Sequence, residues 1–123
     1  MKFKFLLFLF LTSCVTELNK NYEKNSYSSS GFAYIYSDQD FDDKIIKKRF
    51  DNTKLLVAHS KLKTGTLVKL TNPNNNKTIN LKISKKIDYP ELYQILITET
   101  VAKKINLKKE VPYIEIEEIK KNK

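Results

Sequence analysis

His59, the single histidine of the chain, is the residue whose type suggests chemistry most directly. An imidazole changes its charge near neutral pH, so it can transfer a proton in catalysis or bind a metal ion. The sequence offers no second histidine and no paired carboxylate motif for a metal site, so we expect no metal and no cofactor. Three interpretations of His59 stay open: a member of a catalytic pair, a polar residue that lines a ligand groove, and a structural residue hydrogen-bonded at a strand end.

Basic and aromatic side chains are the other candidates for ligand contacts. Lys82, Lys85 and Lys86 form a cluster that could meet carboxylates or phosphates, although charges on the solvated face of a strand are also ordinary. Tyrosine rings could stack on a flat face of a ligand, and the alternative is packing in the core or at its rim. The tyrosines concerned are Tyr34, Tyr36, Tyr89 and Tyr93.

The size and charge of the chain limit the classes of protein to consider. Its 123 residues predict one domain, and 41% hydrophobic residues are near the lower limit for a globular core. The formal net charge of +9 favours an anionic partner, such as a carboxylate-bearing polymer or a membrane surface.

The N-terminus predicts export and lipid attachment. Lys2 and Lys4 precede an apolar run over residues 5–11, which is too short for a membrane-spanning helix and is typical of a signal peptide. The sequence Leu-Thr-Ser-Cys that ends at Cys14 resembles the bacterial lipobox, whose cysteine is lipidated and becomes the new N-terminus. Residues 1–13 are therefore predicted to be the signal peptide, and Cys14 the lipid anchor to the membrane.

The predicted location follows from this anchor. Val15 after Cys14 differs from the Asp that signals inner-membrane retention, so by analogy with other bacterial lipoproteins we expect the outer membrane, facing the periplasm. Export separates the chain from DNA and RNA, so nucleic acid is not an expected partner despite the positive charge. Residues 14–30, rich in Asn and Ser, are predicted to tether a domain over residues 31–119, and residues 120–123 to be a solvated basic tail.

Within that domain the hydrophobic pattern alternates with a period of two, which is typical of strands. In the last strand, Ile114 and Ile116 should face inward, and Glu115 and Glu117 outward. Asn and Pro residues over 72–77 favour a turn between two strands, which predicts a hairpin. The predicted strands are residues 31–36, 66–71, 78–83, 92–97 and 112–119.

The remaining segments predict little further regular structure. Residues 98–107 form the one good helix candidate, with Thr98 as a possible N-cap and Val101 and Ile105 four residues apart. Residues 37–52 are charged and lack a clear period, so we expect a long loop, with a helical turn over 42–50. The pattern as a whole predicts a mainly β fold, a small closed barrel of five or six strands with one short helix.

Three stretches together resemble the double-psi β-barrel of the rare lipoprotein A (RlpA) family. They are LLVAHSKLKTGTLVKLTNPNNNKTINLKI, YQILITETVAKKINL and VPYIEIEEI. Ala58-His59, residues 62–66 and Thr71-Asn72 stand at the intervals of the family's Ala-His, Gly-Thr and Thr-Asn segments. The resemblance covers roughly residues 31–119. It implies a six-stranded double-psi β-barrel in the cell envelope that acts on peptidoglycan, as a lytic transglycosylase in the active members.

The sequence departs from the family where the catalytic acid is expected. The family's Asn-Asp pair falls on Ser84 and Lys85, so the acid is absent, while Lys86 keeps the basic residue that follows. A second family carboxylate falls on Leu96. Cleavage of a glycosidic bond needs a proton donor with a pKa near the working pH. Asp88 is the nearest carboxyl group that could substitute, and Glu91 and Glu99 are more distant candidates.

Two functions follow. The first is a non-catalytic envelope lipoprotein that binds peptidoglycan or a cell-division partner, with Lys85, Lys86 and Tyr89 as ligand-binding residues. The second is a divergent lytic transglycosylase that uses His59 with Asp88 to cleave glycan strands. The loss of the acid favours the first.

The lipid anchor can be tested in cells that make the full chain. We expect labelled palmitate to be incorporated into the wild-type protein and to be lost in a Cys14→Ser variant, because the thiol is the acylation site. Gel electrophoresis with detection of the label measures this. Equal labelling of both proteins would contradict the assignment.

Overall fold

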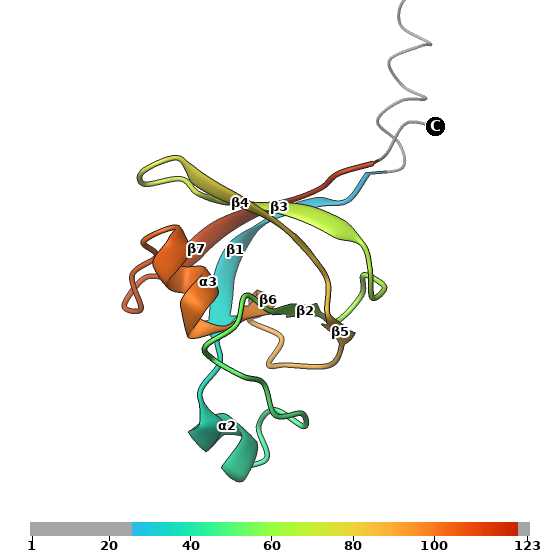
Figure 1. Cartoon of the computed structure of the whole chain (residues 1–123), viewed down its shortest axis with the longest axis vertical. Helices are drawn as coiled ribbons and strands as arrows, with labels where there is room; N and C mark the ends of the chain where they lie inside the picture. The colour runs from blue at the N-terminus through green and yellow to red at the C-terminus, as the bar shows by residue number, and fades with distance from the viewer. Residues whose placement is uncertain (1–25, 121–123) are drawn as a thin grey trace, which may run out of the picture.

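The computed structural model describes residues 26–120, so the predicted signal peptide and Cys14 lie outside the described residues. Seven strands form one mixed sheet (Figure 1). The strands are β1 (Ser28–Ile35), β2 (Val57–His59), β3 (Leu67–Asn72), β4 (Lys77–Lys82), β5 (Lys85–Lys86), β6 (Tyr93–Ile97) and β7 (Tyr113–Glu118). Two short helices, α2 (Asp38–Asp42) and α3 (Glu99–Lys104), complete the fold.

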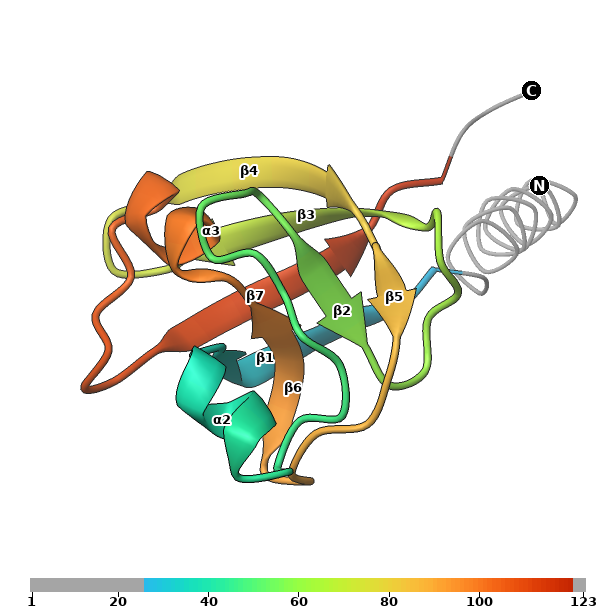
Figure 2. The same cartoon turned by 60° about the horizontal axis from the view of Figure 1, so that its bottom comes forward.

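The sheet has the strand order β4-β3-β7-β1-β6-β2-β5 and curls into a half-barrel (Figure 2). The β3–β4 pair is the predicted hairpin, with Leu70 opposite Ile79. β1 pairs in parallel with β6 and antiparallel with β7, so it lies at the centre of the sheet. The mainly β class is confirmed. The prediction of a closed barrel is wrong, because β4 and β5 stand at opposite ends of the strand order and do not pair with each other. The described residues contain seven strands rather than six and two helices rather than one.

Alternation of apolar and polar residues places the core as expected. Ile114 and Ile116 of β7 are buried, and Glu115 and Glu117 are exposed, because successive side chains of a strand point to opposite faces. The inward residues of β3, β6 and β7 pack with residues of α3 in one cluster. Each fully buried Ile or Leu side chain contributes about 1.5–3 kcal/mol through removal of apolar surface from water.

The strands β2 and β5 were not predicted from the sequence, because β2 has only three residues and β5 only two. Segments this short contain too few positions to show a period. They form because the tertiary structure supplies partners: Ala58 pairs with Leu96 of β6 on one side and with Lys85 of β5 on the other. These two pairings hold the histidine segment in the sheet.

The predicted helix is present, with Thr98 at its N-cap position and with Val101 and Ile105 buried. The side chain that caps the helix comes from elsewhere: Asn52 Oδ1 accepts a hydrogen bond of 2.9 Å from the backbone N–H of Glu99. The hydroxyl of Thr98 instead donates to the carbonyl of Lys54 at 2.6 Å. The loop before β2 is thereby attached to the start of α3.

Buried Asn72 holds the other end of this helix. Its Nδ2 donates to the carbonyl of Ile105 at 2.9 Å and to that of Asn106 at 3.1 Å. The last carbonyls of a helix have no partner within the helix, so these two bonds satisfy groups that would otherwise be costly to bury. The Thr-Asn segment therefore has a structural role here.

The charged segment after β1 was predicted as a loop with a helical turn over 42–50, and this prediction is wrong in two respects. The helix is α2, which begins and ends earlier, and the segment carries a small core of its own. Ile46 and Phe50 are buried against Tyr36, Ala58 and Leu96. Ile46 and Phe50 are isolated apolar residues among charged ones, so they produce no periodic pattern in the sequence. Their burial nevertheless attaches the segment to the sheet.

The folded region also begins earlier than residue 31. β1 starts at Ser28, and Tyr27 and Glu118 exchange backbone and side-chain hydrogen bonds of 2.8 and 3.0 Å. Serines at the start of β1 carry no strand signal, but pairing with β7 requires only their backbone groups. Within residues 26–120, no helix has the length and apolar character needed to cross a membrane.

Adjacent isoleucines provide a test of the small core beneath the charged segment. Ile46 is fully buried and Ile45 is 45% exposed. We expect Ile46→Ala to lower the free energy of unfolding by about 2–5 kcal/mol, because it removes buried methylenes and leaves a cavity. Ile45→Ala, the matched control, should change it by less than about 0.5 kcal/mol. Urea unfolding measures both, and equal effects would contradict the observed packing.

Candidate functional site

His59 lies at the end of β2 and is 1% exposed. Its Nδ1 accepts hydrogen bonds from the backbone N–H groups of Lys61 and Leu62, each at 3.0 Å. Its Nε2 is 3.2 Å from Tyr27 Oη, and the Tyr27 ring packs edge-on against the imidazole with 5.1 Å between centroids. The histidine thus fixes the turn that follows β2 and attaches it to the start of β1.

These partners determine the protonation of the ring. Two N–H groups point at Nδ1, so Nδ1 must hold a lone pair, and in the neutral ring the proton is on Nε2, from which it is donated to Tyr27 Oη. Burial, and then the positive charge of Lys61, lower the pKa of His59 to about 4. The imidazole is therefore neutral at physiological pH, and both of its nitrogens are engaged within the protein.

A cleft of about 710 Å³ opens beside this histidine, and we call it the His59 cleft. Asp88 lies in the same cleft, so the structure brings together the two residues that the sequence suggested as a catalytic pair. Asp88 is exposed, and no hydrogen bond joins it to His59 among the described residues. The lining residues are Tyr27, His59, Ser60, Lys61, Asp88, Tyr89, Glu91, Tyr93 and Gln94.

Tyr89 forms part of the wall of the His59 cleft through two hydrogen bonds of its hydroxyl group. Tyr89 Oη accepts from the N–H of Ser60 at 3.2 Å and donates to the carbonyl of Gln94 at 3.0 Å. Burial raises the pKa of this phenol, so it stays protonated. Lys85 and Lys86, the other predicted ligand-binding residues, are exposed on β5 and do not line the cleft.

Sequence reasoning missed several residues of the cleft, of which Gln94 is the most informative. Gln94 packs over Gly31, where an added Cβ would lie 2.6 Å from Gln94 Cγ. Gln94 Oε1 accepts a hydrogen bond of 2.7 Å from Ser29 Oγ. One of only two glycines in the chain, placed in a strand, signals such a close approach. Lys61 had no comparable signal, because exposed charged residues occur throughout the chain. Glu91, a more distant candidate for the substitute acid, does line the cleft.

No group of three or more His, Cys, Asp or Glu side chains within residues 26–120 is arranged to hold a metal ion. The comparisons with protein-family models and with curated proteins find no match for this chain.

The arrangement favours binding over acid–base catalysis. A general base needs a free lone pair facing the substrate, and the lone pair of His59 Nδ1 faces two backbone N–H groups instead. A general acid needs a carboxyl group protonated near neutral pH, which burial usually achieves, and Asp88 is exposed. Hydroxyl, amide, ammonium and carboxylate groups around an open cleft can still make hydrogen bonds to a polar ligand.

The state of His59 can be measured directly, because the chain has one histidine. We expect its imidazole to titrate in the folded protein with a midpoint near pH 4 and to show the Nε2–H tautomer above it. Nitrogen-detected NMR of the ring reports both properties. A midpoint near 6.5 would contradict the burial and bonding described.

The same shift predicts how stability depends on pH. Between pH 6.5 and 4 the unfolded chain binds a proton at His59 that the folded protein does not bind, so stability should fall as the pH falls through this window. The loss should reach up to about 3 kcal/mol relative to His59→Asn, whose side-chain oxygen can accept the same backbone bonds. Urea unfolding at several pH values measures the free energy of unfolding of both proteins. The prediction would be contradicted if this free energy changed with pH equally in the wild type and in His59→Asn.

Proposed function

We propose that this protein is a non-catalytic lipoprotein of the bacterial cell envelope whose RlpA-like barrel binds peptidoglycan. The observation that carries this proposal is the combination of an open polar cleft with a histidine whose two nitrogens are already engaged. Such a site keeps the shape of a binding cleft and lacks a proton donor and acceptor poised for cleavage. The lipobox at Cys14 supports the envelope location from the sequence.

The chemistry of the cleft fits a peptidoglycan fragment. Glycan strands present hydroxyl and amide groups, and their peptide stems carry both carboxylates and amines. Lys61 can pair with stem carboxylates, and Asp88 and Glu91 can accept hydrogen bonds from hydroxyl or amino groups. Tyr27 and Tyr93 offer rings at the same cleft, where sugar faces can pack. A cell-division protein bound elsewhere on the barrel is compatible with this proposal.

The second candidate is a divergent lytic transglycosylase. One observation favours it: Asp88 and His59 share one cleft. For this mechanism to operate, binding of a glycan strand would have to bury Asp88 and place it beside the glycosidic oxygen. The exposed position of Asp88 in the free protein makes this candidate the weaker of the two.

Co-sedimentation with purified sacculi tests binding. The chain over residues 15–123 should sediment with sacculi, and Lys61→Ala should weaken binding by about fivefold, because one charged contact is lost. Lys85→Ala removes the same charge outside the cleft and should bind like the wild type. The proposal would be overturned if the wild-type chain did not sediment with sacculi at low salt, or if Lys61→Ala and Lys85→Ala weakened sacculus binding equally.

Digestion of the same sacculi distinguishes the two candidates. Mass spectrometry should detect no release of anhydro-muropeptides by the wild-type chain, because both nitrogens of His59 are engaged and the carboxyl groups that line the cleft, those of Asp88 and Glu91, are exposed. A catalytically active family member serves as the positive control for the sacculi. Release by the wild type that is lost in Asp88→Asn would establish the transglycosylase instead.

A further inference from the structure

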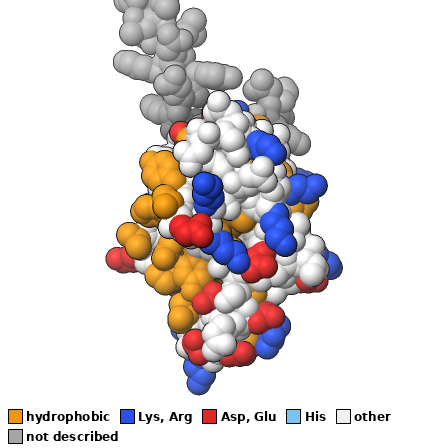
Figure 3. Space-filling view, turned by 90° about the vertical axis from the view of Figure 1, so that its left-hand side faces the viewer, with side chains coloured by type: hydrophobic (Ala, Val, Ile, Leu, Met, Phe, Trp, Pro, Cys, Tyr) orange, Lys and Arg blue, Asp and Glu red, His pale blue; other side chains and the backbone are white. Residues whose placement is uncertain are grey.

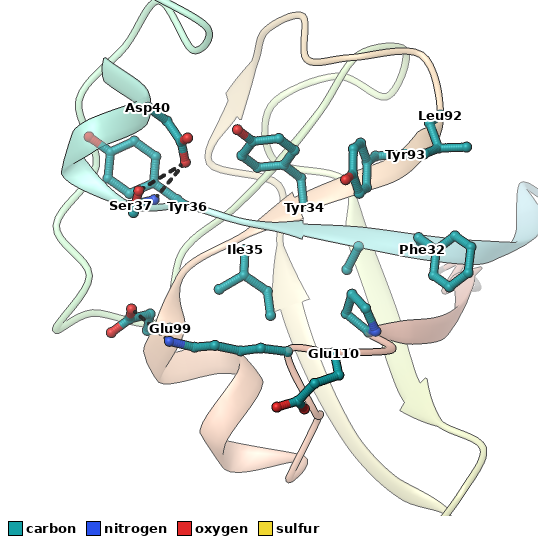
Figure 4. A pocket seen from close by; sticks show the side chains of 13 residues that line it. Phe32, Tyr34, Ile35, Tyr36, Ser37, Asp40, Leu92, Tyr93, Glu99 and Glu110 are labelled. Carbon is teal, nitrogen blue, oxygen red and sulfur yellow. Dashed lines mark hydrogen bonds and ion pairs between the residues drawn. The ribbon is translucent and has the colours of Figure 1, made fainter. Parts of the chain in front are cut away.

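A second hollow, of about 540 Å³, lies along β1, and we call it the β1 groove (Figure 4). Tyr93 lines both this groove and the His59 cleft, so the two hollows are neighbours. Figure 4 shows Tyr34 and Tyr93 side by side along β1, with Leu92 next to Tyr93. None of the groups that hold His59 lines the β1 groove, which is therefore a separate candidate site.

Exposed apolar side chains line part of the groove. Leu92 is 67% exposed and Phe32 is 37% exposed, and Pro112 also lines the groove. Val111, beside Pro112, is 55% exposed. Figure 3 shows hydrophobic side chains gathered along one margin of the molecule, with both acidic and basic side chains close by. Contiguous apolar surface of this kind commonly marks an interaction site.

Aromatic pairs give the groove a rigid floor. Tyr34 packs edge-on against Tyr93 with 4.9 Å between ring centroids, and Phe32 packs in the same way against Tyr113 at 5.8 Å. Burial, followed by hydrogen bonding to Asp40, raises the pKa of Tyr34, so this ring stays uncharged. Rings fixed in this way lose little conformational freedom when a ligand binds.

The charge of the groove is opposite to that of the chain. Its lining includes three carboxylates, those of Asp40, Glu99 and Glu110, and one ammonium group, that of Lys109. Lys109 Nζ lies 3.4 Å from Glu99 Oε2, and Asp40 Oδ2 accepts a hydrogen bond from the N–H of Ser37 at 2.9 Å. Glu110 is exposed, and the described residues provide no ion pair for it. The chain as a whole carries a formal charge of +9.

We propose that the β1 groove binds an extended segment of a partner protein that carries apolar side chains together with Lys or Arg. Charge complementarity selects a cationic partner, and Glu110 is the carboxylate available to pair with it. The aliphatic surfaces of Leu92 and Pro112 select apolar side chains, since sugars pack on ring faces and offer little to exposed aliphatic groups. This partner site is distinct from the peptidoglycan cleft and does not depend on it.

A peptide probe tests the groove, using the chain over residues 15–123. The chain contains no tryptophan, so the fluorescence of one Trp in a synthetic 12-residue peptide of alternating Lys and Leu reports binding without interference. We expect this cationic peptide to bind in spite of the positive charge of the protein. Glu110→Lys should weaken binding by about tenfold and Leu92→Ser by about fivefold, because each removes a groove contact.

Matched substitutions outside the groove are the controls. Glu115→Lys makes the same charge change on the exposed face of β7, and Ile45→Ser removes another exposed aliphatic side chain. Both should leave peptide affinity within about twofold of the wild type. Equal weakening by groove and control variants, absence of peptide binding, or displacement of the peptide by soluble glycan fragments would overturn the proposal. A circular dichroism spectrum and a urea unfolding midpoint close to those of the wild type show that Glu110→Lys is folded, and this control does not depend on sacculus binding.

Discussion

Pairing of β1 with two different neighbours is the constraint on which the rest of the structure depends. β1 forms a parallel ladder with β6 and an antiparallel ladder with β7, so it joins the two parts of the curled sheet. Gly31 allows this packing, since a side chain at that position would collide with Gln94 of β6. The start of β1 brings Tyr27 to His59, and its later residues form the floor of the β1 groove. The position of β1 therefore determines the geometry of both candidate sites.

The second determinant is the position of His59 at the end of a three-residue strand. Its neutral ring holds the turn after β2 through Nδ1 and holds Tyr27 through Nε2. A buried polar group that satisfies all of its hydrogen bonds within the protein stabilises that arrangement and is poorly suited to exchange protons with a ligand. Among the three interpretations suggested by the sequence, the geometry favours the structural residue, at the margin of a cleft that a ligand can still enter.

The two hollows differ in chemistry although they meet at Tyr93. The His59 cleft is bordered by hydroxyl, amide and charged groups, whereas the β1 groove combines fixed aromatic rings, exposed aliphatic groups and an excess of carboxylates. If both proposals hold, the two hollows would let one small domain bind a cell-wall polymer and a cationic segment of a protein at the same time. Such a linking role needs no catalysis.

The sequence by itself determined the mainly β class, the hairpin of β3 and β4, the helix after Thr98 and the inward face of β7, because each depends on a local period or turn. It also placed His59 and Asp88 in one candidate site. Only the tertiary structure decided that His59 is locked by backbone N–H groups, that Lys85 lies outside the cleft, and that aromatic residues of β1 and β6 form a groove. These facts depend on contacts between residues distant in the chain, and short strands and isolated buried anchors leave no local pattern from which such contacts can be inferred.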